Sequence, residues 1–212
     1  MTKLQAFIIP VTPFQQNCSL VFDDAAKVGA IVDPGGDVPR ILEAIRQSGI
    51  TIEKILLTHG HIDHAGGAAE LREALNVPIE GPHTADKFLL ETLPDTGAKY
   101  DIEARAVTPD RWLKEGDTVT VGDLSFAIYE APGHTPGSIV LFNAENRFAL
   151  VGDVIFQGSV GRTDFPYGNH QSLINAIKDK LYPMGDDVVF LPGHGSPSTI
   201  GEERRSNPFL NE

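Results

Sequence analysis

The stretch THGHIDH, residues 58–64, directly follows an apolar segment at residues 55–57. It places four side chains that can bind a metal ion within six residues, at the point where a buried strand would end. Imidazole and carboxylate ligands together suit zinc, iron or manganese, and the lack of thiolates argues against a purely structural zinc cluster. A polar surface loop is the alternative, but three of the seven histidines of the chain fall in this stretch.

Length and composition indicate an ordinary globular protein. The chain has 212 residues, and we expect a single domain over residues 1–212. The net charge of −12, without any basic run, argues against nucleic acid or an anionic membrane as a partner. Cys18 is the single cysteine, the first four residues lack the apolar stretch of a signal peptide, and no apolar run could span a bilayer. A cytoplasmic location is therefore expected, and the oligomeric state is not predicted.

The hydrophobic pattern alternates short strands with helices. We expect helices at residues 38–47, 65–75, 84–93, 171–181 and 201–206. Strands are expected at residues 7–9, 19–22, 29–32, 54–57, 119–121, 124–130, 138–142, 148–152 and 188–191. This order, repeated in two similar halves, predicts two facing sheets with helices on their outer faces.

Three further segments repeat the arrangement of the first one, since an apolar strand leads into a Gly-rich turn that holds a metal-competent residue. They are EAPGHTPG at residues 130–137, LVGD at 150–153 and FLPGHG at 190–195. Glycine before the ligand allows the backbone to turn sharply and aim the side chain over the strand ends. The candidate metal ligands of the four segments are His59, His61, Asp63, His64, His134, Asp153 and His194.

Seven donors exceed what one tetrahedral metal ion can use, because a catalytic zinc takes three protein ligands and keeps one position for water. Two metal ions that share a bridging carboxylate would account for the excess. In such a site a bridging hydroxide can act as the nucleophile at neutral pH, because metal-bound water is strongly acidified. The sequence therefore predicts two divalent metal ions, with zinc as the main expectation and iron or manganese as alternatives.

These residues resemble the metallo-β-lactamase-fold hydrolases, whose His-x-His-x-Asp-His signature matches residues 59–64. Within that fold the chain resembles the short single-domain glyoxalase-II-like proteins of the hydroxyacylglutathione hydrolase type. The resemblance covers essentially the whole chain, from Asn17-Cys18 and DPGG at 33–36 through GSVGRTDF at 158–165 to NPF at 207–209.

The resemblance implies an α/β fold, the αββα sandwich of two mixed sheets, with the site on the edge between the sheets. It also implies a division of the ligands between two metal ions. His59, His61 and His134 would hold one metal, Asp63, His64 and His194 the other, and Asp153 would bridge them. The carboxylates Asp63 and Asp153 are the expected catalytic residues.

Two residues beside the expected site each allow two interpretations. Asp33 ends a strand in a turn, and it either caps that turn or accepts a hydrogen bond from a ligating histidine, as the resemblance suggests. Arg162 follows Asp153 in a Gly-rich loop, and it either contacts an anionic substrate group or pairs with Asp164. His83 and His170 lie outside the Gly-turn pattern and are expected not to be ligands.

For function, the resemblance implies a metallohydrolase of thioesters, with S-lactoylglutathione or a related hydroxyacyl thioester as the small-molecule substrate. Arg162 would hold the glutathione. The chain departs from the glyoxalase II pattern after His194, because the remaining segment is too short for the helical domain that provides further glutathione contacts.

The main alternative is a persulfide dioxygenase with a single iron at His59, His134 and Asp153. That group resembles the chain in the stretch GRTDF at 161–165, and a 2-His-1-carboxylate set with open positions suits oxygen activation. A non-catalytic, metal-stabilised binding module is less favoured, because the ligand set is intact. β-Lactam hydrolysis is not expected, because Asp153 replaces the ligand pattern typical of true lactamases.

Overall fold

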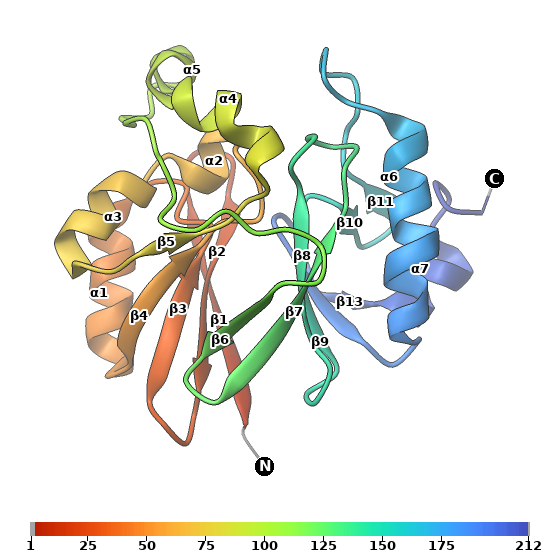
Figure 1. Cartoon of the computed structure of the whole chain (residues 1–212), viewed down its shortest axis with the longest axis horizontal. Helices are drawn as coiled ribbons and strands as arrows, with labels where there is room; N and C mark the ends of the chain where they lie inside the picture. The colour runs from red at the N-terminus through yellow and green to blue at the C-terminus, as the bar shows by residue number, and fades with distance from the viewer. Residues whose placement is uncertain (1–2, 212) are drawn as a thin grey trace.

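Two mixed β-sheets face each other in the computed structural model, which describes residues 3–211 (Figure 1). Helices lie on the outer face of each sheet, so the predicted αββα sandwich is confirmed. The expectation that no signal peptide is present rests partly on Met1 and Thr2, which lie outside the described residues. Within residues 3–211, no helix is long and apolar enough to cross a membrane.

The first sheet has five strands in the order β1-β2-β3-β4-β5. Their bounds are β1 Leu4–Val11, β2 Gln16–Asp23, β3 Val28–Val32, β4 Thr51–Leu56 and β5 Ile79–Glu80. The pairs β1–β2 and β2–β3 are antiparallel, whereas β3, β4 and β5 run parallel. Helices α1 (Val38–Ser48) and α3 (Ala68–Leu75) cover its outer face.

The second sheet has six strands in the order β13-β12-β9-β8-β7-β6. Their bounds are β6 Thr118–Val121, β7 Leu124–Glu130, β8 Ile139–Asn143, β9 Phe148–Gly152, β12 Val189–Pro192 and β13 Ser198–Thr199. Strands β9 and β12 are parallel neighbours, so the residues that follow them leave the sheet at the same edge. Helices α6 (His170–Ala176) and α7 (Ile200–Ser206) cover this sheet, and α6 continues into a π-helical turn, η2 (Ile177–Leu181).

Three layers of buried side chains hold the sandwich together. One lies between the first sheet and its helices and includes Ile41 and Leu71. The middle layer lies between the two sheets, with Phe126 at its centre, and the third packs Leu173 and its neighbours on the second sheet. Each large apolar side chain buried in these layers stabilises the fold by roughly 1.5–3 kcal/mol.

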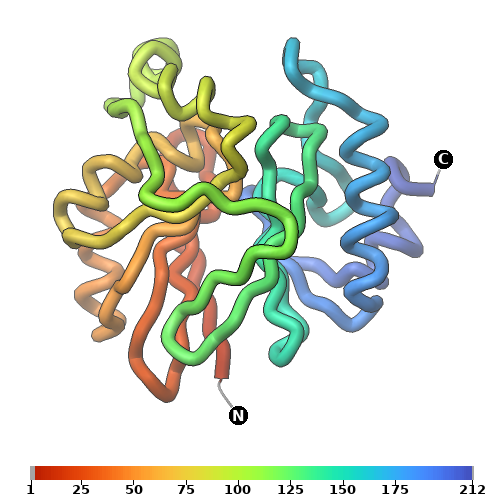
Figure 2. Tube along the Cα trace, in the orientation of Figure 1, coloured from red at the N-terminus to blue at the C-terminus, as the bar shows by residue number. Residues whose placement is uncertain are grey.

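Short elements at one end of the sandwich surround the strand ends that carry the candidate ligands. They are α2 (Ile62–Ala65), the 3₁₀ turn η1 (Thr84–Asp86), α4 (Lys87–Glu91), α5 (Leu93–Tyr100) and the hairpin of β10 (Ile155–Phe156) with β11 (Ser159–Val160). The segment from residue 101 to 117 then runs from the first half of the molecule across to the second (Figure 2). A second 3₁₀ turn, η3 (Tyr182–Met184), follows η2.

Two expected helices are broken in the structure. The helix expected at 65–75 is divided into α2 and α3, because the Gly67 amide donates to the Pro34 carbonyl at 2.8 Å instead of continuing one helix. The helix expected at 84–93 is divided into η1 and α4, and α5 starts afresh with Pro94 in its first turn and extends to Tyr100. The two-residue strands β5, β10, β11 and β13 were not predicted, because so few residues show no periodicity.

Candidate metal centre

The loop after β4 and the loop between β7 and β8 bring His59, His61 and His134 together. The Nε2 atom of His59 lies 3.2 Å from His61 Nδ1, and His134 Nε2 lies 3.0 Å from the same atom. One ring nitrogen from each of these residues can therefore serve as a ligand of the same metal ion. We call these three residues the first cluster.

Asp63, His64 and His194 form a second cluster of potential ligands. Helix α2 carries the first two, and His194 follows β12. The distance from Asp63 Oδ2 is 3.1 Å to His194 Nε2 and 3.7 Å to His64 Nε2. The two groups consist of the same residues that the family resemblance implies for two metal ions.

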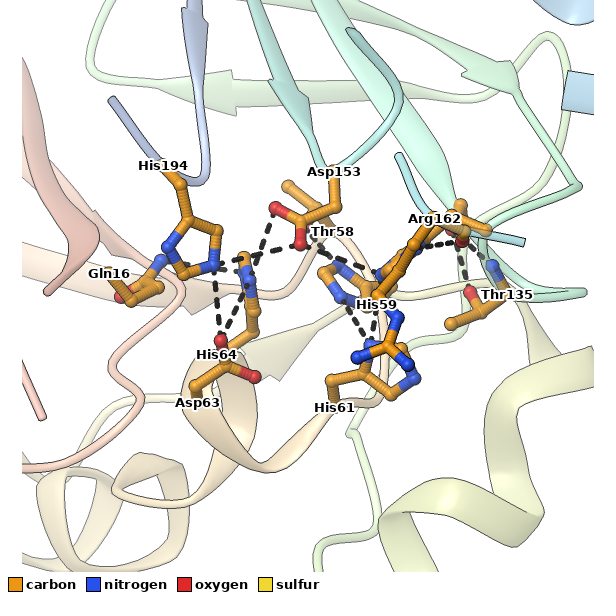
Figure 3. A network of polar contacts seen from close by, with 12 residues as sticks. Gln16, Thr58, His59, His61, Asp63, His64, Thr135, Asp153, Arg162 and His194 are labelled. Atoms are coloured by element: carbon orange, nitrogen blue, oxygen red, sulfur yellow. Dashed lines mark hydrogen bonds and ion pairs between the residues drawn. The ribbon is translucent and has the colours of Figure 1, made fainter. Parts of the chain in front are cut away.

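Asp153 lies between the two clusters (Figure 3). Its Oδ2 atom is 3.5 Å from His134 Nε2 and 3.6 Å from His194 Nε2, and its Oδ1 atom is 3.3 Å from His64 Nε2. The carboxylate follows β9, whereas His194 follows the parallel neighbour β12, which is why both side chains reach the same edge. A bridging role for Asp153 is compatible with these positions.

Hydrogen bonds behind the imidazole rings determine which nitrogen carries the lone pair. His134 Nδ1 donates to the Arg162 carbonyl at 2.8 Å, and His64 Nδ1 donates to Asp33 Oδ2 at 2.9 Å. When such a ring is neutral and donates through Nδ1, its Nε2 is the acceptor that faces the cluster. His61 is reversed, because its Nε2 lies 2.9 Å from the Tyr167 hydroxyl and its Nδ1 faces the cluster.

Asp33 supports both clusters from the end of β3. It sits in the left-handed region at φ 52°, a conformation that aspartate tolerates better than most residues. Its carboxylate accepts from the Thr58 amide at 2.7 Å and the Thr58 hydroxyl at 2.6 Å, besides the bond from His64. The Thr58 oxygen in turn lies 3.1 Å from His59 Nδ1. Of the two interpretations of Asp33, the hydrogen bond from a histidine is present, whereas its carboxylate accepts no bond from its own turn among the described residues.

The electrostatics of the two clusters differ. In the first cluster, burial and the neighbouring histidines lower the pKa of His59 well below its ordinary value and lower the pKa of His61 to about 3. Burial likewise lowers the pKa of His134. At neutral pH these three rings are uncharged, which leaves their lone pairs available to a metal ion.

Carboxylates dominate the second cluster. Burial opposes the shift, but Asp153 and Asp63 raise the pKa of His64 well above its ordinary value. Burial opposes the shift at His194 as well, but the hydrogen bond that its ring donates to Asp63 and the charge of Asp153 raise the pKa of His194. The excess of negative charge that stabilises a protonated imidazole here would equally stabilise a bound cation.

Two buried polar atoms fit a metal ion better than they fit the protein alone. His64 Nε2 and Asp153 Oδ1 are buried and have no hydrogen-bond partner among the described residues. Buried polar atoms are normally satisfied, because an unsatisfied one costs about 1–3 kcal/mol. Both atoms are typical zinc, iron or manganese ligands and both face the cluster, so the donor set fits a divalent cation.

The loop that carries His194 is built for close approach. A Cβ atom at Gly193 would clash with Asp153 Oδ1 and with the His64 ring, so only glycine fits between these side chains. Asn17 holds the same loop from β2, because its Nδ2 donates to the carbonyls of Pro192 at 3.0 Å and Gly195 at 2.8 Å.

A cavity of about 610 Å³ lies above the two clusters. The cavity is lined by Leu89 of α4, by Leu93 of α5, and by Phe165 and Tyr167 from the loop after β11. The floor contains His61, Asp63, His134, Asp153 and His194. The cavity is therefore largely apolar, with the metal-competent atoms at its base.

Two basic side chains line the cavity, and their pairing differs. Arg162 forms two bonds to Asp164, at 2.8 and 2.9 Å, and its guanidinium lies 4.5 Å from the centre of the Phe165 ring. Of the two interpretations of Arg162, the pairing with Asp164 is thus present, and the side chain still faces the cavity. Lys99 in α5 has no ion-pair partner among residues 3–211.

His83 and His170 belong to none of the candidate metal groups within the described residues. His83 Nδ1 accepts from the Ala85 amide at 3.2 Å, and His170 is exposed at the start of α6. Among the residues that contact the site or line its cavity, the sequence interpretation assigned no role to Asn17, Asp86, Lys99 or Tyr167. None of them stands in a Gly-rich turn after a strand, the pattern that indicated the metal ligands.

Comparison with known proteins places this geometry in a family. The model of the metallo-beta-lactamase superfamily matches residues 11–194. Hydroxyacylglutathione hydrolase GloC of Haemophilus influenzae is 48% identical over 206 residues, which cover 96% of this chain and 97% of that protein.

Two solved structures are also similar. The BLEG-1 B3 metallo-beta-lactamase has a TM-score of 0.90 and 32% identity, over 98% of this chain and 100% of that one. The protein TTHA1623, described in a di-iron-bound form, has a TM-score of 0.87 and 33% identity, over 96% of this chain and 100% of that one.

Proposed function

The chain belongs to the metallo-β-lactamase superfamily, and we propose that it is a metal-dependent hydrolase of S-lactoylglutathione or a related hydroxyacyl thioester. The observation that carries this proposal is the position of Asp153 between two clusters of metal-competent side chains, at the base of one cavity. The similarity to a hydroxyacylglutathione hydrolase over nearly the whole of both chains supports the thioester as the bond that is cleaved.

In this proposal one metal ion would be held by His59, His61 and His134, and the other by Asp63, His64 and His194. Asp153 would supply the carboxylate between them. Bound there, two divalent cations would acidify a water molecule and polarise the thioester carbonyl. Zinc is the proposed metal. Iron is its main competitor, because a structurally similar protein is described in a di-iron-bound form.

The remaining residues of the site act on the orientation of ligands and substrate. Asp33 and Tyr167 hold His64 and His61 in the tautomers whose free nitrogens face the clusters. The apolar walls exclude water from the substrate, and the thioester carbonyl would lie at the base of the cavity, near Asp153. The carrier of the acyl group would then extend past Arg162 and Lys99.

An assay of products and oxygen tests the proposal. Purified protein loaded with zinc, or separately with iron, is given S-lactoylglutathione while free thiol and dissolved oxygen are followed. We expect thiol release without oxygen consumption, and loss of the release in Asp153→Ala.

Two other outcomes would assign the protein differently. Oxygen uptake on glutathione persulfide, with little thioester cleavage, would support a dioxygenase with a single iron at His59, His134 and Asp153. Rapid opening of a chromogenic cephalosporin would support the activity by which the structural relative BLEG-1 is named. Either result without thioester cleavage overturns the proposal.

A further inference from the structure

Asp86 is a buried carboxylate outside the two clusters. It ends the turn η1, directly before α4, and its side chain is fully buried. Within the described residues it forms no ion pair. Burying a carboxylate without a cation is costly unless several hydrogen bonds compensate for the lost water.

Three donors converge on this carboxylate, and they come from two loops. The Gly60 amide donates to Oδ2 at 2.8 Å, the Thr135 hydroxyl donates to Oδ2 at 2.7 Å, and the Gly137 amide donates to Oδ1 at 2.6 Å. Gly60 lies between His59 and His61, and Thr135 follows His134 directly. All three ligands of the first cluster therefore lie next to a residue that Asp86 binds.

The backbone around Asp86 is shaped for this contact. A Cβ atom on Gly137 would lie 2.7 Å from the Asp86 Cγ, so glycine is needed for the amide to approach the carboxylate. The His83 amide donates to the Gly137 carbonyl at 3.1 Å, which ties the start of η1 to the same loop. By contrast, Asp86 makes no hydrogen bond to Asp63, His64 or His194 of the second cluster.

We propose that Asp86 is a positioning residue that clamps the two loops carrying the first cluster and so sets the affinity of that cluster for its metal ion. The inference rests on the proposed metal-binding role of His59, His61 and His134. A carboxylate suits the clamp because it presents acceptors on both oxygens, whereas an amide offers one oxygen and turns two N–H donors toward the remaining donor groups.

The test compares two buried carboxylates. Asp23, at the far end of β2, is also buried and accepts from the amides of Ala25, Ala26 and Asp123 at 2.9, 3.3 and 3.1 Å. Zinc affinity is measured by competition with a chelating indicator for the wild type, Asp86→Asn and Asp23→Asn. We expect Asp86→Asn to weaken the binding of one of the two zinc ions by about tenfold or more, which is the range for residues that support metal ligands. Asp23→Asn should leave both affinities within about twofold.

If Asp86 only stabilised the fold, the result would differ. Both variants would then be less stable than the wild type, and neither would lose affinity for one zinc ion in particular. Unchanged zinc affinity in Asp86→Asn, or an equal loss in Asp23→Asn, would therefore overturn the proposal. If Asp86→Asn does not fold, Thr135→Val replaces it, since valine keeps the shape of the side chain but lacks the hydroxyl that donates to Asp86 and lies 2.7 Å from Ser138 Oγ. Thr135→Ser, which keeps that hydroxyl, should then bind zinc as the wild type does, and equal behaviour of the two Thr135 variants would also contradict the clamp.

Two controls separate this inference from the proposed function. His59→Ala should remove the same zinc ion that Asp86→Asn weakens, and retention of both ions in His59→Ala would refute the metal centre itself. In the metal-free protein, the amide proton signals of Gly60 and Gly137 should shift upfield in Asp86→Asn, because their carboxylate acceptor is lost. Unmoved signals would contradict the clamp whatever activity the enzyme has.

Discussion

The Oδ1 atom of Asp153 lies 3.3 Å from Nε2 of His64, and neither atom has a hydrogen-bond partner among the described residues. Both atoms are buried, and each faces the space between the two clusters. A pair of unsatisfied, buried ligand atoms is unfavourable in a protein interior, and a shared cation would satisfy both. This relationship makes Asp153 the residue whose removal should disturb the site most.

Asp153→Ala is expected to abolish thioester hydrolysis and to lower the bound metal, because it removes the carboxylate that contacts both clusters. His170→Ala is the control, since His170 is exposed at the start of α6 and belongs to no candidate metal group. Steady-state kinetics and elemental analysis of both variants, at matched thermal stability, provide the comparison. Equal losses in the two variants would refute the assignment of Asp153.

Removal of the metal ions should destabilise the protein. Freshly purified protein is expected to hold close to two metal ions per chain, and a ligand that binds only the folded state stabilises it in proportion to RT ln(1 + [L]/Kd). Dialysis against a strong chelator should therefore lower the melting temperature, and zinc should restore it. At most one bound metal, with no gain on adding zinc, iron or manganese, would argue against the two-metal centre.

The ligands of the site could be recognised in the sequence, because each segment that carries them follows a strand at a Gly-rich turn. His59, His134, Asp153 and His194 all obey that pattern, and parallel strands such as β9 and β12 bring their ends to one edge. The division of the ligands into two clusters was predicted only from the family resemblance. Spacing along the chain does not determine which side chains face the same metal ion.

The supporting residues could not be predicted in the same way. Asp86 and Tyr167 reach the first cluster through the packing of η1 and of the loop after β11, which no periodicity describes. The cavity walls are also a tertiary feature, since a separate helix that was not expected, α5, follows α4 and brings Lys99 to the cavity. The local sequence pattern therefore predicted the metal ligands. The residues that surround those ligands depend on contacts between segments that are distant in the chain.

Tyr167→Phe should weaken the metal ion of the first cluster. The hydroxyl lies 2.9 Å from His61 Nε2, and its loss leaves that N–H without its acceptor while the stacking with Phe165 at 5.4 Å is retained. We expect about tenfold weaker zinc binding at one site, the lower end of the range for groups that support ligands. Indicator competition measures the effect, and an unchanged affinity would show that the hydroxyl does not orient His61.

The last prediction concerns the two basic residues of the cavity. Lys99→Ala is expected to raise KM by up to about fivefold at nearly constant kcat, because an exposed ionic contact contributes roughly 0.2–1 kcal/mol and is shared by ground and transition states. Arg162→Ala should raise KM less, since Asp164 already neutralises much of its charge through two hydrogen bonds. Lys87→Ala is the matched control, because Lys87 pairs with Glu91 at 3.6 Å on α4 and does not line the cavity.

Kinetics on S-lactoylglutathione and on a thioester of an uncharged thiol provide the measurement. If Lys99 recognises an anionic carrier, its removal should affect only the charged substrate, and an equal effect on both substrates, or an effect no larger than that of Lys87→Ala, would contradict this role.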